Sequence, residues 1–291
     1  MARLRVDHET VYTYSDPVLC SNHLAHLQPR DTGRQHWLSH RLTIEPEPTS
    51  VQDRVDIYGN RAIAFSVERE YKVFRVVTEG VVDVADQAEV ADDCPWEAVA
   101  SAVPRHLELS MFAFASPYAS FDETIRSYAR QSFSADRSVF AACSELMTRI
   151  YTDFRYAPGT TRIGDQPPEL LRRRQGVCQD FAHVMIACLR SIGLPCRYVS
   201  GYLRTYPPPG QAKLVGCDAT HAWVAAWCGP QDGWVEFDPT NNRLAGADHV
   251  VLAWGRDFGD VSPLKGVVTG GGYSTLRVAV NVDLDTVKEK S

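Results

Sequence analysis

Residues 174–192 read RQGVCQDFAHVMIACLRSI, and this stretch decides the fold of the second half of the chain. After the glycine at position 176, an apolar pattern of helical period runs from Cys178 to Ile192. One face of that helix carries Cys178, Phe181, Ala182, Met185, Leu189 and Ile192. The pattern therefore predicts a helix that begins at Cys178 and holds this cysteine in its first turn, on the inward side.

The start of a helix suits a reactive thiol. Its first N–H groups have no intrahelical partner and carry partial positive charge, which favours thiolate over thiol. The same groups can stabilise an oxyanion that forms next to the sulfur. A buried structural cysteine at a helix start is the alternative, and Cys178 alone does not decide between the two.

A predicted β-hairpin supplies the partners that a catalytic thiol needs. Residues 219–227 alternate as a strand that carries His221, residues 228–233 have turn composition, and residues 234–240 form the return strand that carries Asp238. With residues 229–232 as the loop, His221 lies diagonal to Asp238 on one face. A register slip of one residue would separate them. An imidazole oriented by a carboxylate is the base that a nucleophilic thiol requires.

These residues resemble a known family. The segments 176–182 (GVCQDFA), 221–223 (HAW) and 234–240 (WVEFDPT) look like the three motifs of the transglutaminase-like core. The resemblance implies a papain-like core, with Cys178 as nucleophile, His221 as base and Asp238 as the third member of the triad, and with no cofactor.

The N-terminal region extends this resemblance over nearly the whole chain. Residues 13–18 (TYSDPV) and 24–30 (LAHLQPR) are similar to the N-terminal β region of the bacterial branch of the family. Tyr156 matches a recurrent family segment before the nucleophile, without an assigned role.

The chain is thus predicted to be α+β, with helices against an antiparallel sheet in the core and a β-rich, sandwich-like N-terminal domain. The short alternating runs before residue 90 indicate a sandwich or a strongly curved sheet. We expect four parts. They are an N-terminal β-rich domain at 1–90, a connecting segment at 91–120, the catalytic core at 121–265, and a strand at 266–291 that returns to the N-terminal sheet or stands apart.

Composition excludes several other classes of protein. Of the 291 residues, 44% are hydrophobic and 23% charged, and the net charge of −6 gives no basic surface for nucleic acid or an anionic membrane. No apolar run has the length of a transmembrane helix, and the start lacks the pattern of a secretory signal. We therefore expect a soluble cytoplasmic protein with no membrane partner.

Metal binding is also not expected. The eight cysteines include no C-x-x-C pair, so a zinc site from Cys217, His221 and Cys228 is disfavoured. No H-E-x-x-H segment is present, which argues against a metal-dependent hydrolase.

Four further features of the sequence have a structural and a functional interpretation. His183 lies about 140° round the helix from Cys178, so it is a poor base. The arginines at 172–174 are a solvated face or a cluster that steers an acidic substrate. Trp223 and Trp227 favour a core role over a substrate platform. Residues 206–210 (YPPPG) form a stiff loop that suits the rim of a cleft.

The predicted function is attack on amide bonds in a peptide or amide substrate. Hydrolysis and acyl transfer to an amine acceptor use the same triad and differ in whether the cleft excludes water. Bacterial members of the resembled family are commonly described as cysteine proteases, which favours hydrolysis. A catalytically silent scaffold that binds a peptide is the alternative from another class. The sequence does not indicate an oligomeric state.

Overall fold

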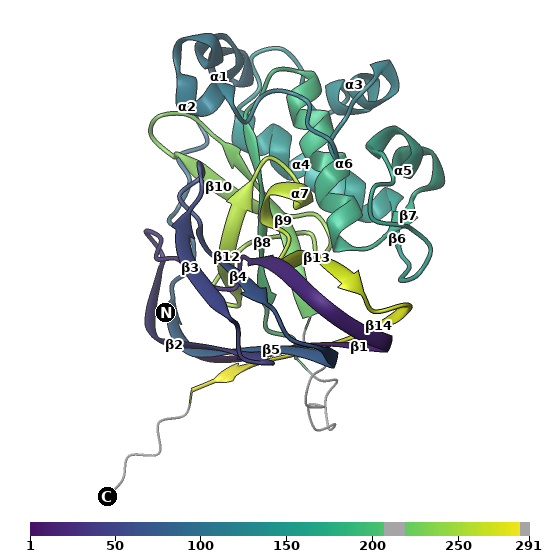
Figure 1. The fold of residues 1–291 in the computed structure, drawn as a ribbon. Coiled ribbons are helices and arrows are strands. Elements are labelled where there is room, and N and C mark those ends of the chain that lie inside the picture. The colour runs from purple at the N-terminus through teal and green to yellow at the C-terminus, as the bar shows by residue number, and fades with distance from the viewer. Residues whose placement is uncertain (207–218, 286–291) are drawn as a thin grey trace, which may run out of the picture.

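The computed structural model describes residues 1–206 and 219–285. Two antiparallel sheets dominate these residues, and helices cover part of one of them (Figure 1). In the described residues, no helix has the length and apolar character that crossing a membrane requires.

The first sheet is built from both ends of the chain. Its strands follow the order β2-β5-β1-β4-β3, and β13 and β14 also pair with β1. Figure 1 shows the C-terminal strand in yellow beside the purple start of the chain. The strands are β1 (Ala2–Ala25), β2 (Gln35–Glu45), β3 (Ser50–Val55), β4 (Arg61–Val67), β5 (Tyr71–Val84), β13 (Leu264–Gly270) and β14 (Ser274–Leu284).

β1 is long enough to serve two parts of this sheet. Its first half pairs with β5 and β14, and its second half with β4 and β13. The register on β5 shifts between Thr13 and Val18, and Leu4 and Val18 nevertheless reach the same buried cluster. The strand therefore bends around one core. The result is one curved seven-stranded sheet, in agreement with the strongly curved sheet that the short alternating runs indicate.

The second sheet has the order β11-β10-β9-β8-β12, and all its pairs are antiparallel. Its strands are β8 (Cys196–Leu203), β9 (Ala219–Trp227), β10 (Trp234–Asp238), β11 (Arg243–Leu244) and β12 (His249–Gly255). Trp227 lies opposite Trp234 and Val224 opposite Phe237, which is the register predicted for the hairpin.

Seven α-helices and one short 3-10 helix accompany this sheet in the described residues. They are α1 (Trp96–Ala102), η1 (Val103–Arg105), α2 (Leu107–Ser110), α3 (Glu123–Arg130), α4 (Val139–Asp153), α5 (Pro167–Arg173), α6 (Cys178–Ser191) and α7 (Phe258–Val261). Two short parallel strands, β6 (Arg155–Tyr156) and β7 (Gln175–Gly176), lead into α6.

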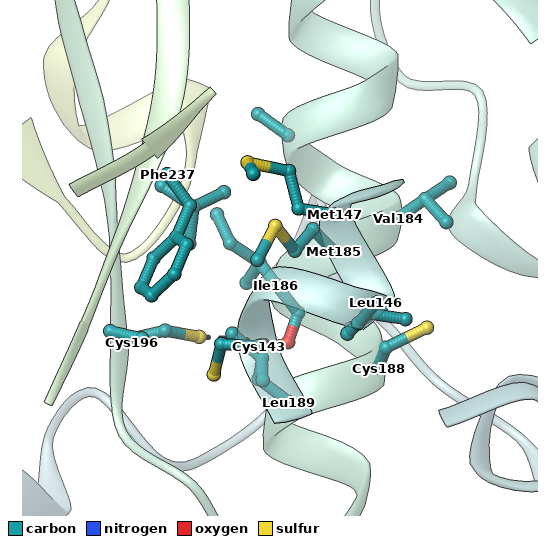
Figure 2. Close-up of a cluster of buried hydrophobic side chains, with 14 of the residues drawn as sticks. Cys143, Leu146, Met147, Val184, Met185, Ile186, Cys188, Leu189, Cys196 and Phe237 are labelled. Atoms are coloured by element: carbon teal, nitrogen blue, oxygen red, sulfur yellow. Dashed lines mark hydrogen bonds between the residues drawn. The ribbon is translucent and has the colours of Figure 1, made fainter. Parts of the chain in front are cut away.

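α6 is a buried helix and not a surface helix with one apolar face. Every residue from Asp180 to Ser191 is buried, because α3, α4 and α5 cover the sides that the sheet leaves open. Figure 2 shows side chains of α4 and α6, such as Met147 and Met185, packed together beside Phe237 of the sheet. The single inward face predicted from the sequence therefore understates how firmly α6 is held.

The segment 91–120 contains α1, η1 and α2 and is tied to the core through a buried cation. Arg190, near the end of α6, donates hydrogen bonds to the carbonyl oxygens of Phe112, Cys196 and Arg256. Three carbonyl dipoles thus replace the water that this guanidinium loses on burial.

The two sheets share one apolar core. Tyr202 of β8 and Val250 of β12 belong to the same buried cluster as Leu4 of β1 and Val282 of β14. Other parts of β8 and β9 pack on α6. One sheet is therefore covered partly by a helix and partly by the N-terminal sheet, and the candidate site lies where these two covers meet.

Candidate active site

The nucleophile helix begins at a tightly specified turn. Asp180 accepts a hydrogen bond from the backbone N–H of Val177 at 2.8 Å and another from the hydroxyl of Thr161 at 2.7 Å. A Cβ on Gly176 would lie 2.4 Å from the same carboxylate, so only glycine fits there. These contacts fix the chain on both sides of Cys178, whose side chain is half-buried.

His221 and Asp238 meet as the hairpin register predicts. The Nε2 of His221 donates to Oδ2 of Asp238 at 2.8 Å, and both side chains are buried. Cys178 is the other group that raises the pKa of His221, and the two side chains line the same cleft. Because Asp238 occupies Nε2, the ring nitrogen left for the thiol is Nδ1. The structure thus brings all three predicted residues together.

Asp238 is a fully buried carboxylate with a complete set of donors. Besides His221, its Oδ2 accepts from Nδ2 of Asn241 at 2.7 Å and from Nε2 of His249 at 3.1 Å. Its Oδ1 accepts from the backbone N–H groups of Thr240 and Asn241. Burial would raise the pKa of Asp238, but the hydrogen bonds from His221 and His249 and the charge of His221 outweigh it and hold this pKa well below its usual range.

His249 is the residue of this network that sequence reasoning missed. Its Nδ1 accepts the N–H of Gly246 at 3.2 Å, which places the ring proton on Nε2, where it donates to Asp238. Burial lowers the pKa of His249 despite the nearby carboxylate, so the ring is neutral. It comes from β12, at the edge of the sheet away from β10.

His221 is the charged member of the network. Burial would lower its pKa, but the bonds to Asp238 and Cys178 and their charges raise it to about 10. His221 is therefore an imidazolium at neutral pH, in the cleft that also contains the Cys178 thiol. This is the electrostatic arrangement that a thiolate–imidazolium pair requires.

The same three side chains also group as metal ligands do. Ligand atoms of His221, Asp238 and His249 lie within 4.8 Å of one another. Zinc bonds of about 2.0–2.1 Å in a tetrahedron would hold neighbouring ligand atoms about 3.3 Å apart. The observed 2.8 and 3.1 Å are hydrogen-bond distances, so these residues fit a proton network better than an ion.

Cys178 and His221 line a cleft of about 340 Å³. The core contributes Gln179, Tyr198, Ser200, Thr220, Ala222, Ile163 and Phe258 to its lining. The remaining lining comes from the N-terminal sheet and from the two residues that precede its strand β13. These residues are His8, Thr10, Tyr12, Ser262, Pro263, Leu264, Leu276 and Val278. The N-terminal sheet therefore forms one wall of the cleft.

The other histidine and the tryptophan near the site have local partners. His183 is buried, stacks on Tyr118 and accepts the backbone N–H of Phe258, so it does not serve the thiol. Trp223 is fully buried and donates to Glu236.

The arginines at 172–174 form ion pairs with Asp153, Asp165 and Glu169. Tyr156, which has no predicted role, has its ring 6.5 Å from that of Phe181 in α6. Partial burial, and to a smaller extent Cys178, raise the pKa of Tyr156. Cys217 and most of the predicted rim loop at 206–210 lie outside the described residues.

Comparison with known proteins agrees with this geometry. Residues 126–239 match the sequence model of the Transglutaminase-like superfamily, and residues 4–83 match that of the Bacterial transglutaminase-like N-terminal region. An uncharacterized protein of Mycobacterium bovis is 40% identical over 290 residues, which is 96% of this chain and 92% of the relative. The chain belongs to the transglutaminase-like superfamily. An uncharacterized Mycobacterium leprae member is 31% identical over 97% of this chain and 99% of its own length.

A solved structure and a curated enzyme are also similar to this chain. A solved structure from Cytophaga hutchinsonii, described as a candidate cysteine protease, superposes with a TM-score of 0.75 at 21% identity and covers 97% of this chain and 90% of its own. That similarity shows the transglutaminase-like α+β fold with its N-terminal β region. The Protein-glutamine gamma-glutamyltransferase of Pseudomonas aeruginosa is 31% identical over 137 residues, which is 47% of this chain and 20% of that protein.

Proposed function

We propose that the protein is a thiol-dependent amide-bond enzyme of the cysteine peptidase or amidase type, with Cys178, His221 and Asp238 as its triad. The observation that carries this proposal is the 2.8 Å hydrogen bond between His221 Nε2 and Asp238 Oδ2, which leaves Nδ1 for the thiol. Both reacting side chains line one cleft, so a bound amide can reach them together.

The reaction has two halves. The Cys178 thiolate attacks the carbonyl carbon, and the N–H groups at the start of α6 stabilise the resulting oxyanion. The C–N bond then breaks as His221 gives its Nδ1 proton to the leaving amine, and a thioester remains on the sulfur. Water next gives a proton to His221 as its oxygen attacks the thioester, and the C–S bond breaks to release the acid.

Asp238 acts on this reaction through His221. Its negative charge stabilises the imidazolium, and its hydrogen bond fixes the plane of the ring. His249 and Asn241 in turn hold the carboxylate, so both are positioning residues in this proposal.

Hydrolysis is favoured over transfer because the cleft is in contact with solvent. Three of its lining side chains, Ile163, Leu276 and Val278, are exposed, so water reaches the thioester. Acyl transfer to an amine is the second candidate, and the partial similarity to a glutamine glutamyltransferase favours it. The peptide or amide substrate is part of the proposal in both cases.

Mass spectrometry of products tests the proposal directly. The protein is incubated with a peptide mixture and an excess of a primary amine, and acid products are compared with amide products. We expect mainly acid products, none with Cys178→Ala, and no change with Cys94→Ser, a half-buried thiol outside the cleft. Mainly amide products would favour transfer. Peptide binding without turnover in the wild type would favour a silent scaffold and overturn the proposal.

A further inference from the structure

β14 carries one row of alternate apolar side chains from the core into the cleft. Val282 and Val280 are buried in the core shared by the two sheets. Val278 and Leu276 continue the same face of the strand, but they are 44% and 56% exposed and line the cleft that contains Cys178. The row thus leaves the core beside the candidate nucleophile with its last two side chains uncovered.

β1 extends this wall sideways. Thr10 lies opposite Val278, Tyr12 opposite Leu276, and His8 opposite Val280, and all three β1 residues line the cleft.

His8 adds no charge to the wall. Its Nδ1 lies 2.9 Å from the hydroxyl of Tyr202 and its Nε2 3.0 Å from that of Thr10, and burial lowers its pKa to about 4. The imidazole is therefore neutral at physiological pH.

The charged side chains of these strands lie on the opposite face. Arg75 pairs with Glu9 at 2.7 Å, and Arg277 pairs with the same carboxylate. No aspartate, glutamate, lysine or arginine occurs among the described residues that line the cleft. An ionised group placed over Leu276 and Val278 would lose water, and no aspartate, glutamate, lysine or arginine of this lining would offset the loss. An apolar group would instead cover these two exposed side chains.

From this juxtaposition we propose that the β1–β14 wall is a specificity subsite, which binds an uncharged apolar side chain adjacent to the amide that Cys178 attacks. The inference rests on the proposed function, since it places the occupant by its reaction with Cys178. It assigns the N-terminal sheet a direct part in substrate selection, through Leu276 and Val278.

Small alkylating probes test this subsite without a known substrate. Iodoacetamide is compared with iodoacetyl derivatives of leucine amide, aspartate amide and lysine amide, and alkylation of Cys178 is followed by peptide mapping. Each rate is divided by the iodoacetamide rate of the same variant, which cancels differences in thiol reactivity. We expect the leucine probe to react about 10-fold faster than the aspartate and lysine probes.

Variants of β14 locate the effect. In Leu276→Lys and Val278→Lys the leucine preference falls about 10-fold and the aspartate probe gains. Leu276→Asn repeats the loss without adding a charge, should a lysine variant fail to fold. Thr275→Lys is the matched control, because it lies on the opposite face of the same strand and keeps the wild-type preference.

Two failures are distinguishable. Equal rates for the leucine and aspartate probes in the wild type, or equal effects of Thr275→Lys and Leu276→Lys, would overturn the subsite alone. If iodoacetamide reacts with Cys178 as with an ordinary thiol and His221→Ala changes nothing, the proposed function and the subsite are both wrong.

Discussion

Asp238→Asn is the substitution that tests the buried charge network most directly. Asparagine keeps the size of the side chain and one accepting oxygen, but it removes the negative charge beside His221. Burial alone would lower the pKa of His221, but the net effect is a rise to about 10. The Asp238 carboxylate contributes most to that rise. Without that charge, burial dominates, and we expect the ring to be neutral at pH 7.

The size of the effect follows from the pKa. A value raised from 6.5 to about 10 corresponds to a preference of about 5 kcal/mol for the imidazolium. When the imidazolium is lost, Cys178 behaves as a thiol without an ion pair. A free thiol, with a pKa near 8.5, is ionised in only about 0.3% of molecules at pH 6. We therefore expect Cys178 alkylation at pH 6 to be about 100-fold slower in the variant than in the wild type.

The assay is the rate of iodoacetamide labelling of Cys178 between pH 5 and 9, resolved by peptide mapping. The wild-type rate should stay nearly level from pH 6 to 8, while the variant rate should rise with pH like that of a free thiol. Asp53→Asn, an exposed change in the N-terminal sheet, is the control and should follow the wild type. Superimposable profiles for wild type and Asp238→Asn would refute the charge network.

The same substitution alters the pH dependence of stability. A raised histidine pKa stabilises the folded state fully below about pH 6.5, and this stabilisation is lost as pH rises through about 10. Urea unfolding should therefore show a fall in the free energy of unfolding from pH 7 to 10 that is larger in the wild type than in Asp238→Asn.

Two further substitutions test how the site is held. His249→Phe fills the space of the ring but removes the donor to Asp238. In urea unfolding, this change should lower the free energy of unfolding by about 2 kcal/mol. His249→Gln keeps an N–H donor and should recover part of that free energy. Equal stability of these two variants would contradict the assigned bond. Gly201→Ala would place a Cβ 2.0 Å from the carbonyl oxygen of Val250, so it should lower the free energy of unfolding by about 3 kcal/mol or more. Gly33→Ala, whose Cβ would have nothing within 4 Å, should lower it little in the same experiment. Similar midpoints for the two alanine variants would show that β8 and β12 can separate.

The sequence predicted the parts of the site that depend on local chemistry. Glycine, proline and aspartate between two alternating runs specify the β9–β10 hairpin, so the diagonal placement of His221 and Asp238 follows from the loop length. The helix start at Cys178 follows from Gly176 and the apolar period after it. The structure confirms both predictions. The sequence could make them because each depends on contacts between residues close in the chain.

The parts that the sequence did not predict depend on distant contacts. His249 reaches Asp238 from β12, which joins the sheet on the far side of β8, and nothing in the run HVVLAWG separates it from an ordinary strand histidine. Asp16 and Pro17 look like the end of a strand, but pairing with other segments carries β1 through them to Ala25. In each case tertiary contacts override the local pattern.

The arrangement of burial separates chemistry from recognition in this protein. Asp238 is fully buried and accepts five hydrogen bonds, so any change there leaves several donors unpaired and affects stability as well as reaction. Leu276 and Val278 are exposed and line the cleft, so substitutions at these positions leave the core intact. The wall comes from β14, whereas the proposed triad comes from α6, β9 and β10, so the preferred substrate can vary along β14 while the reacting groups keep their geometry.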